Sequence, residues 1–542
     1  MGQTLQSTAA GTTTTSVRDA TFDVMRRHGL TRIFGNPGST EVPFLTDLPS
    51  DIEFVMALHE GSVVGMATGY ALATGEPVFV NLHTAPGLGN AINAIANARD
   101  SHAPLVIVVG QQDRKQLPLS PFLSGRALER VAGEYPVWSN MPARPQDVPG
   151  AIARAYHEAK AASGPAIVVV PMGDWQEPFD ASPAGAPVTI VRPAAVSSEQ
   201  LDPLVELLAD AESPAIVIGA GTDTREGWDG AIALAERLGC PVWHEPFSPR
   251  SGFPEDHPQF AGHLDWHRRA MRATLEPYDT VLVLGTKAFQ LYILDEDAPP
   301  VRPGTRVALI TATAEEAHSS ACELAVVGPV AAICAALAER LPARSGSTVT
   351  PMSRPPAPSP PAAGEPLQSS HVLALLAERL EADAILMEEA PSARPEMLER
   401  IPTRMPLGFV SNANGGLGFG LSGAIGLRMG QPDRPVVAVV GDGSAMFGIQ
   451  ALWSAARYNV GVLLIVMANG SYGVMDAQAQ ARGGEAPWPG FPGLDIAGIS
   501  RALGCPATRV ETYEELQSTL GEALDGLRER TQPLLIEVAV SR

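Results

Sequence analysis

Two polar residues follow two apolar runs within GDGSAMFGIQALWSAARYNVGVLLIVMANGSYG, residues 441–473. Asp442 comes just after Val436–Val440, and Asn469 comes just after Val462–Met467. Both runs have the continuous apolar character of buried parallel strands, with a helical pattern between them. A right-handed crossover would place the two polar residues at the same end of one sheet. That end is where open α/β sheets bind ligands.

A carboxylate and an amide oxygen at one place are hard donors that suit Mg²⁺ or Ca²⁺. Two or three protein oxygens do not complete an octahedral shell, so phosphate oxygens and water would supply the rest. Ser444 and the helix start after Gly443 offer hydroxyl and amide donors to the same phosphate. An aspartate before a helix is often only a cap, but the asparagine after the second strand argues against that reading. The residues therefore predict a site for a metal ion and a diphosphate.

The spacing from GDG to the asparagine resembles the thiamine diphosphate motif. The resemblance implies that the Asp442 carboxylate, the Asn469 side chain and the backbone carbonyl of Ser471 bind Mg²⁺. It also implies a carboxylic acid elsewhere that holds N1′ of the cofactor's aminopyrimidine ring, because this ring removes the thiazolium C2 proton only when so held. A glutamate in apolar surroundings is suited to share that proton.

Glu60 is the candidate for this acid, since it follows the apolar run Phe54–Leu58 and precedes a helix start of small residues. The alternative is a first-turn glutamate that interacts only with the helix dipole. Ser39, in FGNPGSTEVPFL, and His83, in VNLHTAPGLGNA, each follow another apolar run, Thr31–Phe34 and Val78–Leu82. A lone serine or histidine is usually structural. Three polar residues after three successive strands, however, are expected to share one crevice.

These segments are similar to the thiamine diphosphate-dependent 2-oxo acid decarboxylases over nearly the whole chain, and within that family to the benzoylformate decarboxylases. GGLGF at 415–419 and PGLD at 492–495 add to the likeness. The resemblance implies that Ser39 positions the substrate carboxylate and that His83 transfers a proton to or from the reaction intermediate. Leu417 would bend the cofactor, and the carbonyl of Gly415 would receive its 4′-amino group. The residues expected to bind the cofactor are Glu60, Ser392, Gly415, Leu417, Gly443, Ser444 and Tyr472.

The chain departs from this family at two places. In LGTKAFQLYILDED, Tyr292 stands where the family has a second catalytic histidine. Tyrosine donates a hydrogen bond and gives up a proton less readily at neutral pH. Val474 and Met475 are expected to line the substrate pocket, but the segment after Tyr472 is more polar than a wall for a phenyl ring. A 2-oxo acid other than benzoylformate is therefore an open alternative.

The expected reaction is decarboxylation of a 2-oxo acid to an aldehyde and CO₂ without oxidation, with thiamine diphosphate and Mg²⁺ as cofactors. The alternative with the same cofactor is a carboligase of the acetolactate synthase or benzaldehyde lyase type, which forms or cleaves 2-hydroxy ketones. Residues 218–221 suggest a dinucleotide-dependent oxidoreductase, but Thr224 replaces the third glycine of that fingerprint. A bound flavin without a redox role stays compatible with the sequence. A relative that binds the cofactor without turnover is disfavoured, because Glu60, Asp442 and Asn469 are all present.

Apolar runs alternate with helical patterns along three parts of the chain, which predicts an α/β protein with three doubly wound parallel-sheet domains. The Pro-, Ser- and Ala-rich stretch at 345–366 cannot build a core and predicts an extended linker. The predicted segments are a disordered tail (1–16), an N-terminal aminopyrimidine-binding domain (17–185), a middle domain (190–342), a linker (343–366) and a C-terminal diphosphate- and Mg²⁺-binding domain (367–542).

Composition excludes several classes of partner. The net charge is −21, with 38 Lys and Arg against 59 Asp and Glu, so nucleic acid and anionic membranes are poor partners. The apolar runs are far shorter than the roughly 20 residues that span a bilayer. Four widely spaced cysteines predict free thiols and a cytoplasmic protein. The resemblance implies a homodimer or homotetramer, because in the family the glutamate of one subunit meets the cofactor held by another.

Overall fold

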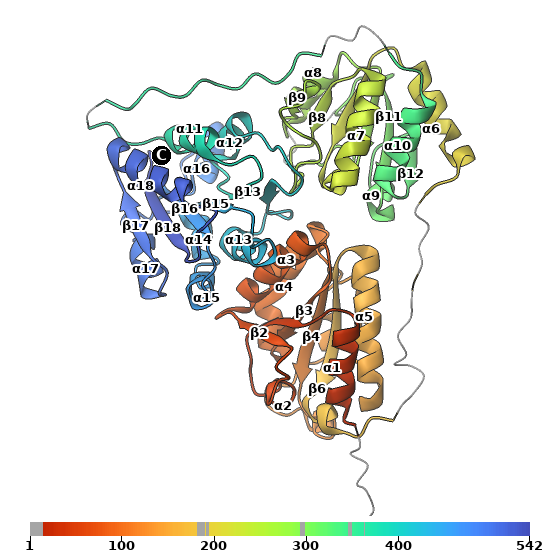
Figure 1. Cartoon of the computed structure of the whole chain (residues 1–542), viewed down its shortest axis with the longest axis vertical. Coiled ribbons are helices and arrows are strands. Elements are labelled where there is room, and N and C mark those ends of the chain that lie inside the picture. The colour runs from red at the N-terminus through yellow and green to blue at the C-terminus, as the bar shows by residue number, and fades with distance from the viewer. Residues whose placement is uncertain are drawn as a thin grey trace, which may run out of the picture. The chain divides into compact units, whose positions relative to one another are not determined.

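The computed structural model describes residues 15–180, 190, 195–292, 299–344, 349–362 and 364–541. These residues form three six-stranded sheets (Figure 1). Every strand pair in them is parallel, as predicted for an α/β protein. The described residues fall into two compact units, the first within Met1–Ala67 and Glu76–Thr189, the second within Thr68–Gly75 and Ile190–Arg542. Each unit is described by itself.

The sheet of the first unit has the strand order β2-β1-β3-β4-β6-β5. Its inner strands β3, β4 and β6 are fully buried, as expected for a sheet covered on both faces. Helices α1 and α5 lie side by side (Figure 1). The strands are β1 (Arg32–Gly35), β2 (Glu53–Met56), β3 (Val78–Leu82), β4 (Leu105–Gln111), β5 (Trp138–Asn140) and β6 (Pro165–Pro171). The helices along this part of the chain are α1 (Val17–Arg27), α2 (Val42–Leu45), α3 (Glu60–Thr74), α4 (Thr84–Asp100) and α5 (Val148–Ala162). The residues of α3 from Thr68 onward belong to the second unit.

The start of α1 corrects the predicted tail. Ser16 caps α1 through a capping box with Asp19, which satisfies amides that the first turn leaves unpaired. The carbonyl of Thr15 accepts a hydrogen bond from the Phe179 amide at 2.8 Å. Residues 15 and 16 therefore belong to the fold, while residues 1–14 lie outside the described residues.

The middle sheet has the order β12-β11-β10-β7-β8-β9. Helices α7 and α10 pack together (Figure 1). The strands are β7 (Pro214–Ile218), β8 (Val242–His244), β9 (Phe260–His263), β10 (Thr280–Leu284), β11 (Arg306–Thr311) and β12 (Leu324–Val327). The helices are α6 (Ser198–Asp210), α7 (Arg225–Leu238), α8 (Arg268–Leu275), α9 (Ala314–His318) and α10 (Val330–Arg340).

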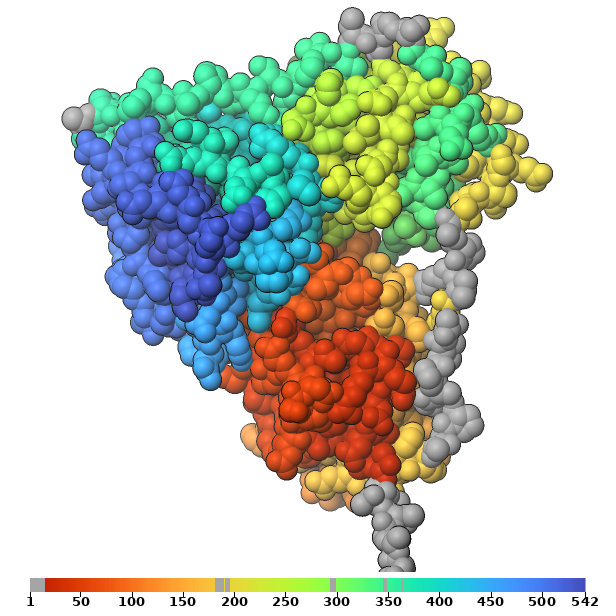
Figure 2. Space-filling view, viewed as in Figure 1, coloured from red at the N-terminus to blue at the C-terminus, as the bar shows by residue number. Residues whose placement is uncertain are grey.

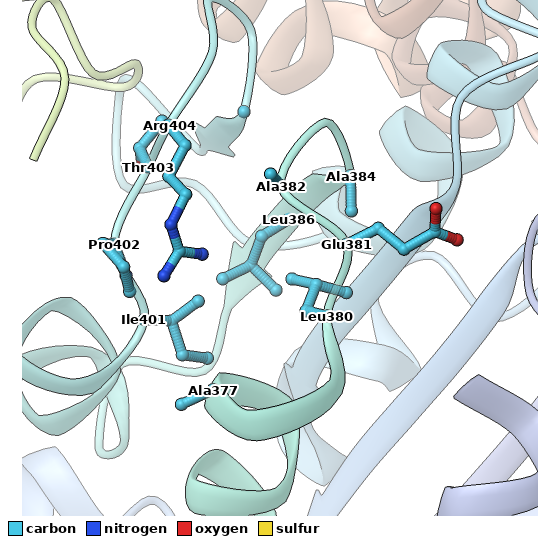
Figure 3. A pocket seen from close by; sticks show the side chains of 11 residues that line it. Ala377, Leu380, Glu381, Ala382, Ala384, Leu386, Ile401, Pro402, Thr403 and Arg404 are labelled. Carbon is cyan, nitrogen blue, oxygen red and sulfur yellow. The ribbon is translucent and has the colours of Figure 1, made fainter. Parts of the chain in front are cut away.

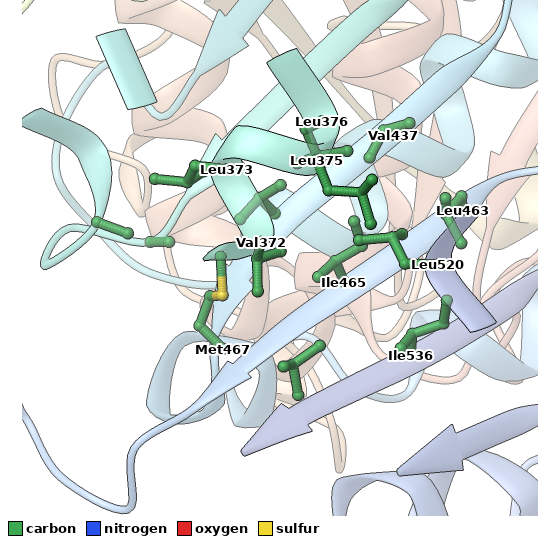
Figure 4. Close-up of a cluster of buried hydrophobic side chains, with 14 of the residues drawn as sticks. Val372, Leu373, Leu375, Leu376, Val437, Leu463, Ile465, Met467, Leu520 and Ile536 are labelled. Atoms are coloured by element: carbon green, nitrogen blue, oxygen red, sulfur yellow. The ribbon is translucent and has the colours of Figure 1, made fainter. Parts of the chain in front are cut away.

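The third sheet has the order β14-β13-β15-β16-β18-β17. Its strands are β13 (Ile385–Glu389), β14 (Phe409–Ser411), β15 (Val436–Gly441), β16 (Leu463–Ala468), β17 (Ala507–Val510) and β18 (Leu534–Ala539). Its helices are α11 (Ser369–Arg379), α12 (Arg394–Arg400), α13 (Phe419–Gly430), α14 (Asp442–Met446), α15 (Ala451–Arg457), α16 (Gly473–Ala481), α17 (Ile496–Ala502) and α18 (Tyr513–Asp525). Leu376 of α11 and Leu520 of α18 pack on Ile465 of β16 in a buried apolar cluster (Figure 4). This core holds the strands whose ends carry the predicted metal ligands.

The segment 349–362 has no helix or strand, as predicted for a linker, and its residues lie at the surface (Figure 2). It is nevertheless fastened to the second unit. The Met352 amide donates to the carbonyl of Phe260 at 2.9 Å, and the Arg354 guanidinium donates to the carbonyls of Glu255 and Glu399 at 3.0 Å each. Residues 345–348 and 363, which also belong to the predicted linker, lie outside the described residues.

All predicted strands occur, with ends that agree within two residues. Each sheet lies inside one of the three ranges predicted for domains. No helix in the described part of the chain is long and apolar enough to cross a bilayer.

Candidate active site

Three of the predicted site residues lie along one edge of the first sheet. Ser39 follows β1, Glu60 follows β2, and His83 follows β3. The order β2-β1-β3 makes these strands neighbours, and all their pairings are parallel. The carboxyl ends of parallel strands meet at one edge, so the topology brings together the three residues predicted to share a crevice.

Glu60 is the first residue of α3 and is 8% exposed. Asn36 donates from Nδ2 to Oε1 at 3.2 Å, and Asn90 donates from Nδ2 to Oε2 at 3.0 Å. A Cβ atom at Gly87 would lie 3.3 Å from Oε1, so glycine keeps space beside the carboxyl group. The predicted apolar setting is therefore only partly right: the carboxyl group is buried, but two amides hold its oxygens in place.

His83 contacts two buried residues that the sequence analysis did not single out. Its Nδ1 atom lies 3.0 Å from Oγ1 of Thr40 and 2.9 Å from Oε2 of Glu41. Thr40 is fully buried, Glu41 is 2% exposed, and Ser39 is exposed beside them. The signal that could have found them is the polar run Ser-Thr-Glu in the loop after β1, of which only the serine was considered.

In the second unit, the residues predicted to bind the metal ion and the cofactor follow four neighbouring strands. Ser392 follows β13, Asp442 follows β15, and Asn469 follows β16. Gly415 and Leu417 follow β14, which pairs with β13 at the edge of the sheet. The parallel register of β15 with β16 pairs Gly441 with Met467, so their following residues leave the sheet at the same level.

Asp442 is 4% exposed and begins α14. Its Oδ1 accepts a hydrogen bond from the Gly443 amide at 2.8 Å, and its Oδ2 accepts one from the Gly470 amide at 2.7 Å. Oδ1 of Asn469 accepts a hydrogen bond from the Ser471 amide at 3.0 Å. The carboxylate thus ties the turn after β15 to the turn after β16. Burial raises the pKa of Asp442 against the opposing effect of these amides.

The residues at this end fit a divalent cation. The Ser471 hydroxyl oxygen is buried and has no hydrogen-bond partner among the described residues, which leaves a polar atom that a bound group would satisfy. A buried carboxylate with a raised pKa is stabilised in its ionised form by a nearby cation. The described residues contain no group of three His, Cys, Asp or Glu side chains that could hold a metal. The predicted set uses one carboxylate, one amide and one carbonyl, and these are oxygen ligands that Mg²⁺ accepts.

Glycines keep the surroundings of this end open. A Cβ atom at Gly473 would lie 3.0 Å from the Ser392 hydroxyl and 3.4 Å from Nδ2 of Asn469. A Cβ atom at Gly443 would lie 2.7 Å from the Tyr472 ring, which also makes an edge contact with Phe491 at a centroid distance of 5.1 Å.

The side chains around α16 differ in exposure. Ser444 is 5% exposed, and Tyr472 is 40% exposed. Val474 is half-buried on α16, and Met475 beside it is 45% exposed. In this unit α16 has no buried residue, so the predicted wall of the substrate pocket is an open helix face.

Glu389 organises the loop that contains Gly415 and Leu417, and the sequence analysis missed it. Its Oε1 accepts the amides of Gly418 and Phe419 at 3.0 Å each and Nδ2 of Asn412 at 3.2 Å. Its Oε2 accepts the Gly420 amide at 3.1 Å. Burial nevertheless outweighs these donors and raises the pKa of Glu389 to about 7. In the sequence, Glu389 is one of two neighbouring glutamates at the end of the apolar strand β13, and nothing there marks it as a functional residue.

Comparison with known proteins matches all three parts of the chain to one family. Residues 15–129 match the thiamine pyrophosphate enzyme N-terminal TPP binding domain, 201–337 its central domain, and 396–538 its C-terminal TPP binding domain. Benzoylformate decarboxylase of Pseudomonas aeruginosa is 37% identical over 527 residues, which cover 96% of this chain and 98% of the relative. The chain belongs to the thiamine pyrophosphate enzyme family.

Two solved structures share the architecture of this thiamine pyrophosphate enzyme. The 4-hydroxybenzoylformate decarboxylase of Rhodococcus jostii RHA1 is 35% identical with a TM-score of 0.92, covering 97% of this chain and 99% of that one. Benzoylformate decarboxylase from Polynucleobacter necessarius is 31% identical with a TM-score of 0.91, covering 97% and 98%. The three sheets are therefore those of the family, and the chain contains its thiamine pyrophosphate binding domains.

Tyr292 lies in the middle part of this thiamine pyrophosphate enzyme and is 62% exposed. Its ring makes edge contacts with Phe247 and Trp266, at centroid distances of 5.8 and 5.6 Å. Residues 293–298, which follow it, lie outside the described residues. Its assignment to the place of a histidine stays a prediction.

The glycines that suggested a dinucleotide site in the middle sheet serve packing. A Cβ atom at Gly219 would lie 2.5 Å from Cβ of Thr286, and one at Gly221 would lie 2.7 Å from the Gly285 backbone. The Gly221 amide donates to the carbonyl of Gly285 at 2.7 Å. Both glycines therefore permit close packing between the segment after β7 and the segment after β10. This packing explains the two glycines without a bound nucleotide.

Two cavities in the described part of the thiamine pyrophosphate enzyme contain none of the predicted site residues. One of about 10 Å³ lies at the amino end of β13, between Leu386, Ile401 and Arg404, and has room for about one water molecule (Figure 3). The other, about 900 Å³, is bounded by Trp243, Tyr278 and residues 349–353.

Proposed function

We propose that this thiamine pyrophosphate enzyme is a Mg²⁺-dependent 2-oxo acid decarboxylase that converts a benzoylformate-like acid to an aldehyde and CO₂. The observation that carries the proposal is the edge of the first sheet, where a buried glutamate held by two amides follows β2 and a histidine follows β3, the two strands that flank β1. The relatives named as benzoylformate and 4-hydroxybenzoylformate decarboxylases support this reaction and this class of acid.

In this proposal the second unit binds the diphosphate end of the cofactor. Asp442, Asn469 and the Ser471 carbonyl hold Mg²⁺, and the raised pKa of Asp442 together with the unpartnered Ser471 hydroxyl supports a cation there. Ser392, Ser444 and the amide end of α14 at Gly443 face the phosphates. The loop held by Glu389 presents Gly415 and Leu417, and Tyr472 lies over Gly443. When bound, the cofactor's thiazolium ring accepts the electron pair that decarboxylation releases.

The first unit supplies the residues that transfer protons and bind the substrate. Glu60 would share a proton with the cofactor's aminopyrimidine ring, and Asn36 and Asn90 fix the orientation of its carboxyl group. The exposed Ser39 hydroxyl donates to the substrate carboxylate, and His83 exchanges a proton with the reacting carbon or oxygen. Tyr292 donates a hydrogen bond in the second histidine's role, and Val474 and Met475 line the substrate pocket.

We also propose a homodimer or homotetramer. Large apolar side chains are exposed beside the site residues of each unit, as expected of an interface in an assembly that completes the site. They are Val42 (56%), Leu58 (43%), Phe447 (56%) and Met475 (45%).

A panel of 2-oxo acids tests the reaction. The purified protein, with thiamine diphosphate and Mg²⁺, is incubated with benzoylformate, 4-hydroxybenzoylformate, phenylpyruvate and pyruvate, and CO₂, aldehyde and 2-hydroxy ketone are measured. We expect CO₂ and aldehyde in equal amounts with an aryl 2-oxo acid, and loss of turnover when EDTA removes the metal. A 2-hydroxy ketone as the main product would favour the carboligase. No CO₂ from any acid would contradict both.

A further inference from the structure

We propose that Glu41 is a positioning residue that holds the His83 imidazole with its proton on Nδ1, so that Nε2 is the atom that exchanges protons. The inference rests on the proposed function for the role of Nε2. The hydrogen-bond argument for the tautomer stands on the first unit alone.

The Glu41 carboxylate is buried and meets a hydrogen-bond donor at each oxygen. The Gly38 amide donates to Oε2 at 2.9 Å, and the Thr40 hydroxyl lies 2.6 Å from Oε1. The Nδ1 atom of His83 is 2.9 Å from Oε2. With 2% of its surface exposed, Glu41 exchanges few hydrogen bonds with water, so these three partners have to satisfy it.

The Thr40 hydroxyl decides the tautomer. An ionised carboxylate only accepts hydrogen bonds, so the single hydroxyl proton of Thr40 is donated to Oε1 of Glu41. Toward Nδ1 of His83, 3.0 Å away, the Thr40 oxygen can then only accept. Oε2 of Glu41 also only accepts. Two acceptors therefore face Nδ1, which has to carry the proton, and in the neutral ring Nε2 keeps its lone pair.

Two glycines make room for this arrangement. A Cβ atom at Gly110, on β4, would lie 1.9 Å from Oε1 of Glu41. A Cβ atom at Gly38 would lie 2.3 Å from Nδ1 of His83. Side chains at these positions would collide with the pair, so the backbone of β4 and of the loop after β1 reserves the space.

The contacts at Nδ1 determine which ring nitrogen of His83 can exchange a proton. The His83 side chain is 17% exposed while Glu41 is nearly fully buried, so the ring is held at Nδ1 from inside the fold. With Nδ1 held by Glu41 Oε2, Nε2 is the ring nitrogen left to exchange a proton. Glu41 itself touches neither Glu60 nor any predicted cofactor-binding residue among its described contacts.

The test measures the tautomer in the resting protein, without substrate. The protein is labelled with ¹⁵N-histidine and studied by magic-angle-spinning NMR, with the His83 signals assigned by their loss in His83→Asn. We expect a protonated Nδ1 and an unprotonated Nε2 in the neutral ring. In Glu41→Gln we expect mixed tautomers, because the amide has one accepting oxygen and also donates. An Nε2-protonated ring in the unaltered protein would overturn the inference even if decarboxylation is found.

Kinetics on the acid found in the panel supply the second readout. We expect Glu41→Gln to lower kcat about a hundredfold, the lower range for loss of acid–base catalysis, with KM changed less than threefold. Gly110→Ala should do the same, because its Cβ displaces a carboxylate that keeps its charge. The matched control is Glu53→Gln, an exposed residue on β2 that is paired with the half-buried Arg32, with kcat unchanged. Unchanged kcat in Glu41→Gln and Gly110→Ala, with the tautomer also unchanged, would show that Glu41 does not position His83.

Discussion

Single buried carboxyl groups in this protein differ in what surrounds them, and the surroundings suggest different tasks. Glu60 meets two neutral amides, Glu41 meets a histidine, and Glu389 meets backbone amides of a loop. A carboxyl group between neutral partners can hold a proton and release it. A carboxyl group beside an imidazole orients that ring, and one that binds backbone amides fixes the chain.

Glu60→Gln should lower kcat at least a hundredfold, because the amide cannot share a proton with the cofactor ring. Binding of thiamine diphosphate should change little, since the proposed metal and phosphate ligands lie on the other unit. Isothermal titration calorimetry with the cofactor and Mg²⁺ measures the binding, and a coupled aldehyde assay measures the rate. Turnover in Glu60→Gln equal to that of the unaltered protein would remove Glu60 from the mechanism.

Glu389 predicts a pH dependence of stability. Its pKa is raised by burial to about 7, so the folded state holds the proton more tightly than the unfolded chain does. Its contribution to stability is therefore complete below pH 4.5 and is lost as the pH rises through about 7. Relative to Glu389→Gln, the free energy of unfolding of the unaltered protein should fall by about 2 kcal/mol between pH 5.5 and 8.

Urea denaturation at several pH values measures this difference. Glu378→Gln, an exposed change on α11, serves as the control and should give a curve parallel to that of the unaltered protein. Parallel curves for Glu389→Gln and the unaltered protein would show that Glu389 does not change its protonation in this range.

At the scale of elements, the strand order determines where the candidate site residues lie. Strands β14, β13, β15 and β16 follow one another across the sheet. β13 and β15 pair directly, although β14 and α13 lie between them along the chain. Each strand end contributes one short polar segment, and the apolar cluster beneath fixes their spacing. Small residues set how closely the segments approach.

Gly461→Ala tests that spacing near β16, whose far end carries Asn469. The new Cβ atom would lie 1.6 Å from the carbonyl oxygen of Arg530, so one backbone segment has to move. We expect a loss of about 1–3 kcal/mol in the free energy of unfolding, measured by urea denaturation. Gly526→Ala, whose Cβ atom would meet nothing closer than 3.8 Å, should change stability by less than about 0.5 kcal/mol. Equal stability of the two variants would contradict the crowding at Gly461.

At the scale of the whole molecule, the predicted site residues are divided between two units. Glu60 and His83 belong to the first, and Asp442 and Asn469 belong to the second. The large exposed apolar side chains beside both sets suggest that a second copy of the chain covers them.

Light scattering after size-exclusion chromatography should therefore give two or four times the mass of the 56.9 kDa chain. The physical reason is that water-exposed apolar surface of this kind is stabilised by burial in an interface. Specific activity should fall on dilution as the assembly dissociates. A monomer with full activity would contradict the proposed assembly.

The sequence by itself determined the fold class and, apart from β14, the strands that carry the site. Buried parallel strands are nearly continuous apolar runs, and β15 and β16 were found from that pattern together with Asp442 and Asn469 at their ends. It missed β5, β8, β9, β12, β14 and β17, which are three or four residues long. All of these but β8 lie at sheet edges, and runs this short hold too few residues to show a period.

Only the tertiary structure decided which buried groups support the predicted ones. Thr40, Glu41 and Glu389 are ordinary polar residues in the sequence, and Gly110 is one glycine among many. Their roles come from contacts between segments far apart in the chain, such as Glu41 with His83. A hydrogen bond or a steric limit of this kind depends on distances in space, which no local spacing of residues encodes.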